Sequence, residues 1–368
     1  MPPSFDKDDF SQAGMAVTPH PDAGVLGHLN AVRIGVVTLI GLGYASTMAV
    51  GPGSREWLNV FGYDPSLFGI QVLFFLSGWL AWRSLSRGRT VRQFVASRAR
   101  RTLPWVVFVT LIVTTLLYPL LCDHDAPHAH GVGELAVYFL NNITLIRPGQ
   151  PLPGALDGAL YPCNLQGTIW TLRWGALAYA GLLALHALRL SGRGVFWVIL
   201  IALIAGHVGL NAWVDARGSS ALEPLIPGMR VAVPFVLGVL ARQHRLRLPR
   251  DRAGWAVMAA VALGAATLHY RFLPWSYSIE LLAMTGWCAL AMAALHSRLN
   301  ALRHWPDIVV PLYLGAWPTA QTWLFLQPDI TVPRLVVATL ATIFALALAF
   351  RLLADHIARP VHRRVQPA

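Results

Sequence analysis

Ten stretches of the chain are long and apolar enough to cross a lipid bilayer, and this pattern constrains the fold more than any other feature. A bilayer core needs about 20 consecutive apolar residues per helix. The 368 residues are 55% hydrophobic and only 12% charged, which is typical of a polytopic membrane protein. We therefore predict an all-α polytopic membrane protein with about ten transmembrane helices, near residues 30–50, 66–83, 103–122, 168–189, 195–213, 226–241, 253–270, 276–296, 308–327 and 332–354.

The distribution of arginines predicts the orientation of these helices, because Lys and Arg concentrate in short cytoplasmic connections. With the N-terminus inside, the cytoplasmic connections, their adjoining span ends and the C-terminal tail hold 20 arginines, and the outer connections hold five. The sequence thus predicts an N-in and C-in protein with a cytoplasmic tail at 1–27, a transmembrane domain at 28–356 and a second cytoplasmic tail at 357–368.

The same distribution accounts for the net charge of +12. A nucleic-acid-binding protein would carry a basic face on a soluble domain, whereas these arginines mark one side of a membrane. We expect membrane lipid as a partner and no nucleic acid.

The longest predicted outer connection contains residue types that form disulfides or bind metals. Cys122 and Cys163 bracket it, and both a disulfide and two separate thiols remain open. Between them, the segment "DHDAPHAH" (123–130) has the residue types of zinc or copper ligands, but its spacing matches no closed ligand set. We expect no metal.

An arginine pair follows the second predicted span, in "FVASRARRTLP". Arg98 and Arg101 are three residues apart and would share one face of a helix. Two guanidinium groups on one face suit bidentate binding of phosphates, such as those of coenzyme A. Anchoring at the cytoplasmic membrane surface is the alternative interpretation.

Five stretches resemble one known family in its order and at its spacings: "LFGIQVLFFLSGWL", "FVASRARRTLP", "YFLNNITLIRPGQPLPG", "LQGTIWTLRW" and "PLYLGAWPTAQTWLFLQP". Together they resemble the bacterial acyltransferase-3 membrane proteins from about residue 28 to 360. The resemblance implies a ten-helix inner-membrane bundle that passes an acyl group, usually acetyl, from cytoplasmic acyl-CoA to a glycan at the outer face. It also implies that Arg98 and Arg101 hold the coenzyme A and that Arg33, which leads the first span, belongs to the catalytic machinery.

The sequence departs from the family pattern at two positions. The family has a histidine eleven residues after the position of Arg33, and this chain has Tyr44. Imidazole is a suitable base near neutral pH, whereas a phenol, with a pKa of about 10, stays protonated. The family also has a glutamate about three residues after Trp170-Thr171-Leu172, where this chain continues with Arg173, Trp174 and Gly175.

Other residues are candidates for the missing acid or base. Glu280 lies in the eighth predicted span, and a carboxylate inside the membrane is a functional candidate because its burial is costly. A structural ion pair between Glu280 and Arg173 is the alternative. His207 in the fifth predicted span is a weaker candidate. The predicted catalytic residues are therefore Arg33, Tyr44, Trp170 and Glu280.

These observations lead to one main hypothesis. We expect a bacterial inner-membrane, multi-pass protein that transfers an acyl group from acyl-CoA to a hydroxyl of a cell-surface, exported or lipid-linked polysaccharide. Polysaccharide biosynthesis proteins are expected partners. The alternative is a catalytically silent acyltransferase-like scaffold in a polysaccharide modification or export complex. A small-molecule transporter is a third hypothesis, although no inverted repeat with matching broken helices is evident.

Overall fold

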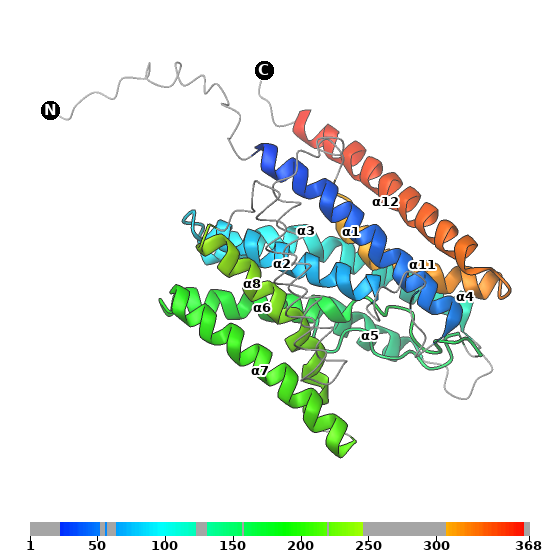
Figure 1. Cartoon of the computed structure of the whole chain (residues 1–368). Helices are drawn as coiled ribbons and strands as arrows, with labels where there is room; N and C mark the ends of the chain where they lie inside the picture. Colours follow the sequence, from blue (N-terminus) through cyan, green and yellow to red (C-terminus); the bar gives the residue numbers. More distant parts are fainter. Residues whose placement is uncertain are drawn as a thin grey trace, which may run out of the picture.

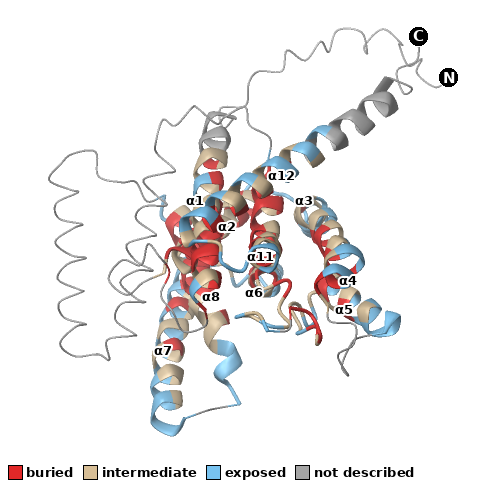
Figure 2. Cartoon of the chain, turned by 90° about the vertical axis from the view of Figure 1, so that its right-hand side faces the viewer, coloured by how far each residue is buried: buried red, intermediate tan, exposed pale blue. Residues whose placement is uncertain are grey.

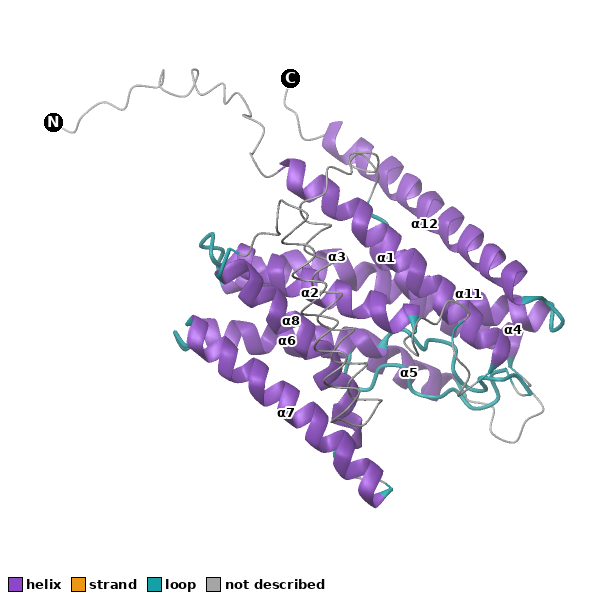
Figure 3. Ribbon diagram, in the orientation of Figure 1, coloured by secondary structure: helices purple, strands orange, loops and turns teal. Residues whose placement is uncertain are grey.

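A computed structural model of the chain describes residues 23–51, 56, 64–122, 131–156, 158–218, 221–245 and 307–363. The described residues form helices joined by loops, and no strand occurs among them (Figures 1 and 3). The helices are α1 (Ala23–Val50), α2 (Pro65–Leu85), α3 (Val91–Ile112), α4 (Tyr118–Leu121), α5 (Val132–Thr144), α6 (Trp170–Ala187), α7 (Arg193–Arg217), α8 (Ile226–Gln243), α11 (Val309–Leu326) and α12 (Val332–Arg363).

Six helical segments are long and apolar enough to cross a membrane, namely Leu29–Val50, Pro65–Leu85, Val91–Leu121, Arg193–Arg217, Glu223–Gln243 and Val332–Phe350. The all-α polytopic membrane fold is therefore confirmed. Helices α6 and α11 coincide with the fourth and ninth predicted spans. The predicted spans at 253–270 and 276–296 lie outside the described residues, so the total of ten stays a prediction.

Two glycines bring α2 and α8 into close contact at the centre of the bundle. A Cβ atom added at Gly78 would lie 2.0 Å from the backbone oxygen of Phe235, and one added at Gly238 would lie 2.1 Å from that of Phe75. Membrane helices approach closely where small residues face each other, because no side chain separates the backbones. The α2–α8 pair is thus a fixed centre against which α1 and α7 pack.

Burial distinguishes the inner helices from the outer ones. In Figure 2 the buried residues are concentrated on α1, α2, α8 and α11, whereas α7 and α12 carry many exposed positions. The exposed residues of these outer helices include large apolar side chains: Trp197, Val198, Ile201, Val337 and Leu346. Apolar side chains on the outside of a helix bundle are suited to contact with lipid.

The basic segment that contains Arg98 and Arg101 is helical, so the third helix begins earlier than the predicted start of the third span near residue 103. Helix α3 begins at Val91 because Thr90 and Gln93 form a capping box: Thr90 Oγ1 accepts the Gln93 N–H at 3.2 Å, and Gln93 Oε1 accepts the Thr90 N–H at 3.1 Å. Such a box satisfies two backbone donors at a helix start. Pro104 therefore lies inside α3, which continues through a π-helical turn (Val113–Leu117) into α4.

Two further features of the helices were not predicted: the early start of α1 and a helix inside the longest outer connection. Helix α1 begins at Ala23, within the segment predicted as the N-terminal tail, because no proline interrupts residues 23–29. The longest predicted outer connection contains α5. In the loop that follows α5, the side chain of Gln166 forms hydrogen bonds with Thr110 (3.0 Å) and Tyr138 (3.2 Å).

Cys122 and Cys163 carry thiols and not a disulfide. Cys288 and residues 123–130 lie outside the described residues.

Candidate functional site

Arginines from two helices converge on one aspartate at the predicted cytoplasmic end of the bundle. Asp307 lies two residues before α11 and forms an ion pair with Arg101 of α3. Arg33 of α1 also reaches Asp307, with 3.8 Å between Nη1 and Oδ1. The side chains of Arg101 and Asp307 are 35% and 40% exposed, so the group faces solvent and its ion pairs are screened. The structure thereby joins two of the predicted site residues, Arg33 and Arg101.

Arg98 lies one turn away on α3 and contacts aromatic rings. Its guanidinium carbon lies 4.8 Å from the ring centre of Phe94 and 5.3 Å from that of Tyr179 on α6. Ring stacking holds an arginine in place while leaving its N–H groups available. The Nε atoms of Arg98 and Arg101 are buried and have no hydrogen-bond partner among the described residues. Both side chains therefore retain donor capacity.

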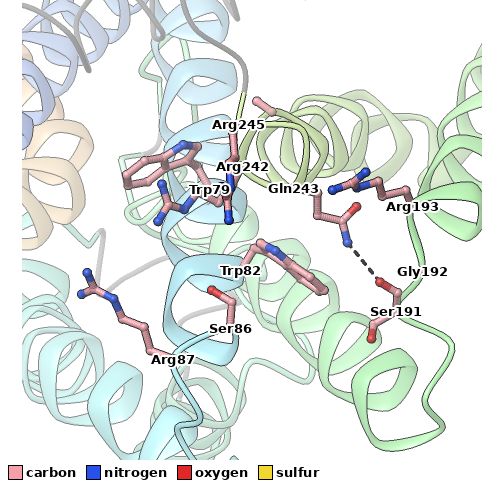
Figure 4. A pocket seen from close by; sticks show the side chains of 11 residues that line it. Trp79, Trp82, Ser86, Arg87, Ser191, Gly192, Arg193, Arg242, Gln243 and Arg245 are labelled. Atoms are coloured by element: carbon pink, nitrogen blue, oxygen red, sulfur yellow. Dashed lines mark hydrogen bonds between the residues drawn. The ribbon is translucent and has the colours of Figure 1, made fainter.

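A separate arginine-lined pocket of about 780 Å³ opens at the same end of the bundle. Its walls are the end of α2, the start of α7 and the end of α8, as Figure 4 shows. Trp79 and Trp82 form the aromatic part, and Arg242 lies 5.0 Å from the ring centre of Trp79. None of the described lining residues is acidic, and four are arginines: Arg87, Arg193, Arg242 and Arg245. The pocket is thus suited to an anionic ligand with a flat ring.

An aromatic cluster lies on the predicted outer side of these arginines, about midway along α11 and nearer the end of α1, and we call it the aromatic end. Tyr44 of α1 packs edge-on against Trp317 of α11, with ring centres 5.3 Å apart, and Tyr161 packs on the same indole at 5.5 Å. The Trp317 Nε1–H donates to the carbonyl oxygen of Asn164 at 2.8 Å. The side chain of Tyr44 is thereby held between α1 and α11.

Hydroxyl groups extend this cluster to the start of α6. The Tyr313 hydroxyl and Thr171 Oγ1 lie 2.7 Å apart, and the Tyr313 hydroxyl also donates to the Thr168 carbonyl oxygen at 3.2 Å. Trp170 is the first residue of α6 and packs beside the same core. Tyr44 and Trp170 are thus linked through Tyr313 and Thr171, and their catalytic roles stay a prediction.

A buried carboxylate lies beside Tyr44. Glu56 is 5% exposed and is the one buried acidic residue among those that the structure describes. It accepts a hydrogen bond from the Ser66 N–H at 2.8 Å, and the Ser66 hydroxyl donates to its other oxygen. Burial raises the pKa of Glu56 to about 7; the two Ser66 hydrogen bonds oppose this shift, and the charge of Asp64 adds to it.

The two ends are separate sites connected by the same helices. Arg33 and Tyr44 are eleven residues apart on α1, which is about 16 Å of helix. At Gly175, where the family pattern has a glutamate, an added Cβ would lie 3.9 Å from the ring of Phe74. Glu280 lies outside the described residues. His207 is fully buried in α7, where Asn211 donates to its carbonyl oxygen at 2.7 Å.

Sequence reasoning missed Asp307 and Glu56. Asp307 precedes a proline-containing apolar stretch and gives no motif, so its role follows only from the proximity of α3 and α1 to the start of α11. Glu56 carried a weak signal as an acid in a predicted outer connection with few charges. Among the described residues, no group of three or more His, Cys, Asp or Glu side chains is arranged to hold a metal.

The fold and these two sites define an all-α integral membrane protein with an arginine-rich end and an aromatic, hydroxyl-lined end. A family model described as an acyltransferase domain matches residues 25–354. The chain therefore belongs to the acyltransferase-3 family, which supports a general acyltransferase role. No curated protein and no solved structure matches the chain.

Proposed function

We propose that this protein transfers an acyl group, in the first place acetyl, from cytoplasmic acyl-CoA to a hydroxyl of a cell-surface, exported or lipid-linked polysaccharide. The transfer takes place in the bacterial inner membrane. The observation that carries the proposal is the separation of two sites in one bundle of an acyltransferase family. One end is lined by arginines, and the other by aromatic rings and hydroxyls.

The arginine end supports the choice of donor. Arg98 and Arg101 lie on α3 with buried Nε donors that have no partner among the described residues, and guanidinium groups bind phosphates well. The pocket between α2, α7 and α8 has a volume within the range of small-molecule sites. Its indoles suit the adenine ring and its arginines suit the phosphates of coenzyme A.

The aromatic end supports a carbohydrate acceptor. Tyr44, Tyr161 and Trp317 offer ring faces and edges, and Thr171 and Tyr313 offer hydroxyls. Such a combination packs against the apolar faces of sugars and hydrogen-bonds to their hydroxyls. Polysaccharide biosynthesis proteins are the partners that would supply the acceptor.

A catalytically silent scaffold in a polysaccharide modification or export complex is the second candidate. It is favoured by Tyr44 in place of the family's histidine and by Gly175 in place of its glutamate, where the described neighbour is the ring of Phe74. On this alternative the arginines serve only to anchor the protein at the membrane surface.

Coenzyme A binding separates the two candidates. We expect the purified protein in nanodiscs to bind acetyl-CoA, and the double variant Arg98→Ala/Arg101→Ala to lose at least about tenfold in affinity. Arg217→Ala is the matched control, because Arg217 also stacks on an indole, 3.8 Å from the ring centre of Trp213, but lies at the predicted outer end. An unchanged affinity in the double variant would remove the pair from the donor site, and absence of binding by the wild type would favour the scaffold.

A further inference from the structure

Helix α1 has a glycine where the carboxylate of Glu56 meets it. A Cβ atom added at Gly43 would lie 2.1 Å from Glu56 Oε2 and 2.7 Å from its Cδ. These distances are too short for any side chain, so the absence of one at Gly43 admits the carboxyl group to this position. The next residue is Tyr44, which stands where the family has its histidine.

The carboxyl group is oriented by α2. Ser66, in the first turn of this helix, donates both its N–H (2.8 Å) and its hydroxyl to the two oxygens of Glu56. The backbone N–H of Glu56 in turn donates to Asp64 Oδ1 at 3.2 Å. Because both donors come from one residue, the carboxylate is held in a single orientation between α1 and α2.

The titratable groups that the structure describes around Glu56 are those of the aromatic end. Tyr44 on α1 and Tyr161 in the loop before α6 both interact with its charge, and Asp64 lies before α2. The pKa of Tyr161 is raised, first by burial and then by the charge of Glu56. Among the described residues, no cationic side chain forms an ion pair with Glu56.

We propose that Glu56 is the general base of this protein and replaces the histidine that Tyr44 has displaced. The inference rests on the proposed acyl transfer. The Glu56 carboxylate accepts the proton of an acceptor hydroxyl as that oxygen attacks the thioester carbonyl carbon. The carbon–sulfur bond then breaks, coenzyme A leaves as the thiolate with the bonding electron pair, and protonated Glu56 returns its proton to the thiolate.

A structural role is the competing explanation, because Glu56 also serves as an N-terminal cap for α2, where a negative charge is favourable. The variant Glu56→Gln distinguishes the two roles. Glutamine keeps the size of the side chain and an oxygen that accepts the Ser66 N–H, but it cannot take up a proton. A capping role would survive this substitution to a large extent, whereas a base would be lost.

The test uses the full-length protein in nanodiscs, with acetyl-CoA as donor and the host's exported polysaccharide, stripped of its esters by mild base, as acceptor. We expect the wild-type rate to rise with pH through about 7, because only the carboxylate form of Glu56 accepts a proton. Glu56→Gln should lower kcat about 100-fold or more and remove this pH step, with acetyl-CoA affinity unchanged. Asp329→Asn, an exposed carboxyl in the loop between α11 and α12, is the matched control and should keep the wild-type rate.

A second variant keeps the proposal testable if Glu56→Gln folds poorly. Ser66→Ala removes the hydroxyl that opposes the upward shift in the pKa of Glu56, so the midpoint of the pH–rate profile should move to higher pH. An unmoved midpoint, or wild-type activity with the pH step intact in Glu56→Gln, would overturn the assignment of Glu56 while acyl transfer stands. A wild-type protein that binds acetyl-CoA and transfers no acetyl under any condition would overturn the proposed function itself, and the role of Glu56 with it.

Discussion

Arg101 of α3 forms an ion pair with Asp307, which lies two residues before α11. This contact joins the two helices at the arginine end and also draws Arg33 of α1 to the same carboxylate. On the proposed function, Asp307 therefore competes with the phosphate groups of the donor for these arginines.

Replacing Asp307 should strengthen donor binding. In Asp307→Asn the carboxylate no longer competes with phosphate for Arg101 and Arg33, so acetyl-CoA affinity should rise about two- to fivefold, as expected for a partly exposed pair. The thermal unfolding midpoint should change little for the same reason. Isothermal titration in nanodiscs checks the affinity, and a weaker binding of acetyl-CoA would show that Asp307 positions the arginines and does not compete for them.

The arginine pocket should recognise the ribose phosphate of coenzyme A. We expect the wild type to bind coenzyme A about tenfold more tightly than dephospho-coenzyme A, which lacks that phosphate. In Arg242→Gln/Arg245→Gln this preference should disappear. Arg189→Gln is the control, since Arg189 is exposed on the same predicted face and does not line the pocket. A preference retained in the double variant would assign the ribose phosphate to another part of the protein.

The close approach of α2 and α8 predicts that alanine substitutions at two glycines will differ clearly in their effect on stability. Gly78→Ala should destabilise the protein by about 1–3 kcal/mol, because its methyl group would collide with the backbone of α8, which cannot move aside as a side chain can. Gly35→Ala on α1 has no atom of the described residues within 4 Å of the added carbon and should be neutral or stabilising by about 0.5–1 kcal/mol. Thermal unfolding in detergent measures both, and equal midpoints would contradict the packing described for α2 and α8.

The hydroxyl group of Tyr44 should contribute less to the acetyl-transfer rate than its aromatic ring does. If Glu56 is the base, Tyr44→Phe keeps the edge-on contact with Trp317 and should lower the acetyl-transfer rate by less than about tenfold, the loss expected for one hydrogen bond. Tyr44→Ala removes the ring between α1 and α11 and should lower both the rate and the unfolding midpoint. A loss of 100-fold or more in Tyr44→Phe would instead make the hydroxyl part of the proton transfer.

The apolar pattern predicts the helices well, because each bilayer crossing needs a stretch of about 20 apolar residues. It misplaces the start of α3, since hydropathy does not detect a capping box such as that of Thr90 and Gln93. A search for a Ser or Thr followed three residues later by Glu or Gln would have found it. The start of α1 at Ala23 is missed for a similar reason, because a helix continues beyond the bilayer until a breaker ends it.

The candidate site is predicted in part. Arg33, Arg98 and Arg101 belong to local motifs, and the structure places them at one end, two of them on a shared carboxylate. Glu56 and Asp307 could not be predicted in their roles, because these follow from contacts between segments far apart in the chain. Only the folded bundle places Asp307 against α3 and α1, and only the position of Gly43 allows Glu56 to lie against α1.

Ester-linked acetyl on the host's surface and exported polysaccharide tests the central claim most directly. The measurement compares a deletion strain with the same strain complemented by the wild-type gene or by the Arg98→Ala/Arg101→Ala variant at matched protein levels. We predict that deletion removes acetyl, that the wild type restores it and that the arginine variant does not. An acetyl content unchanged by deletion, with altered glycan amount or chain length, would contradict acyl transfer and support the scaffold.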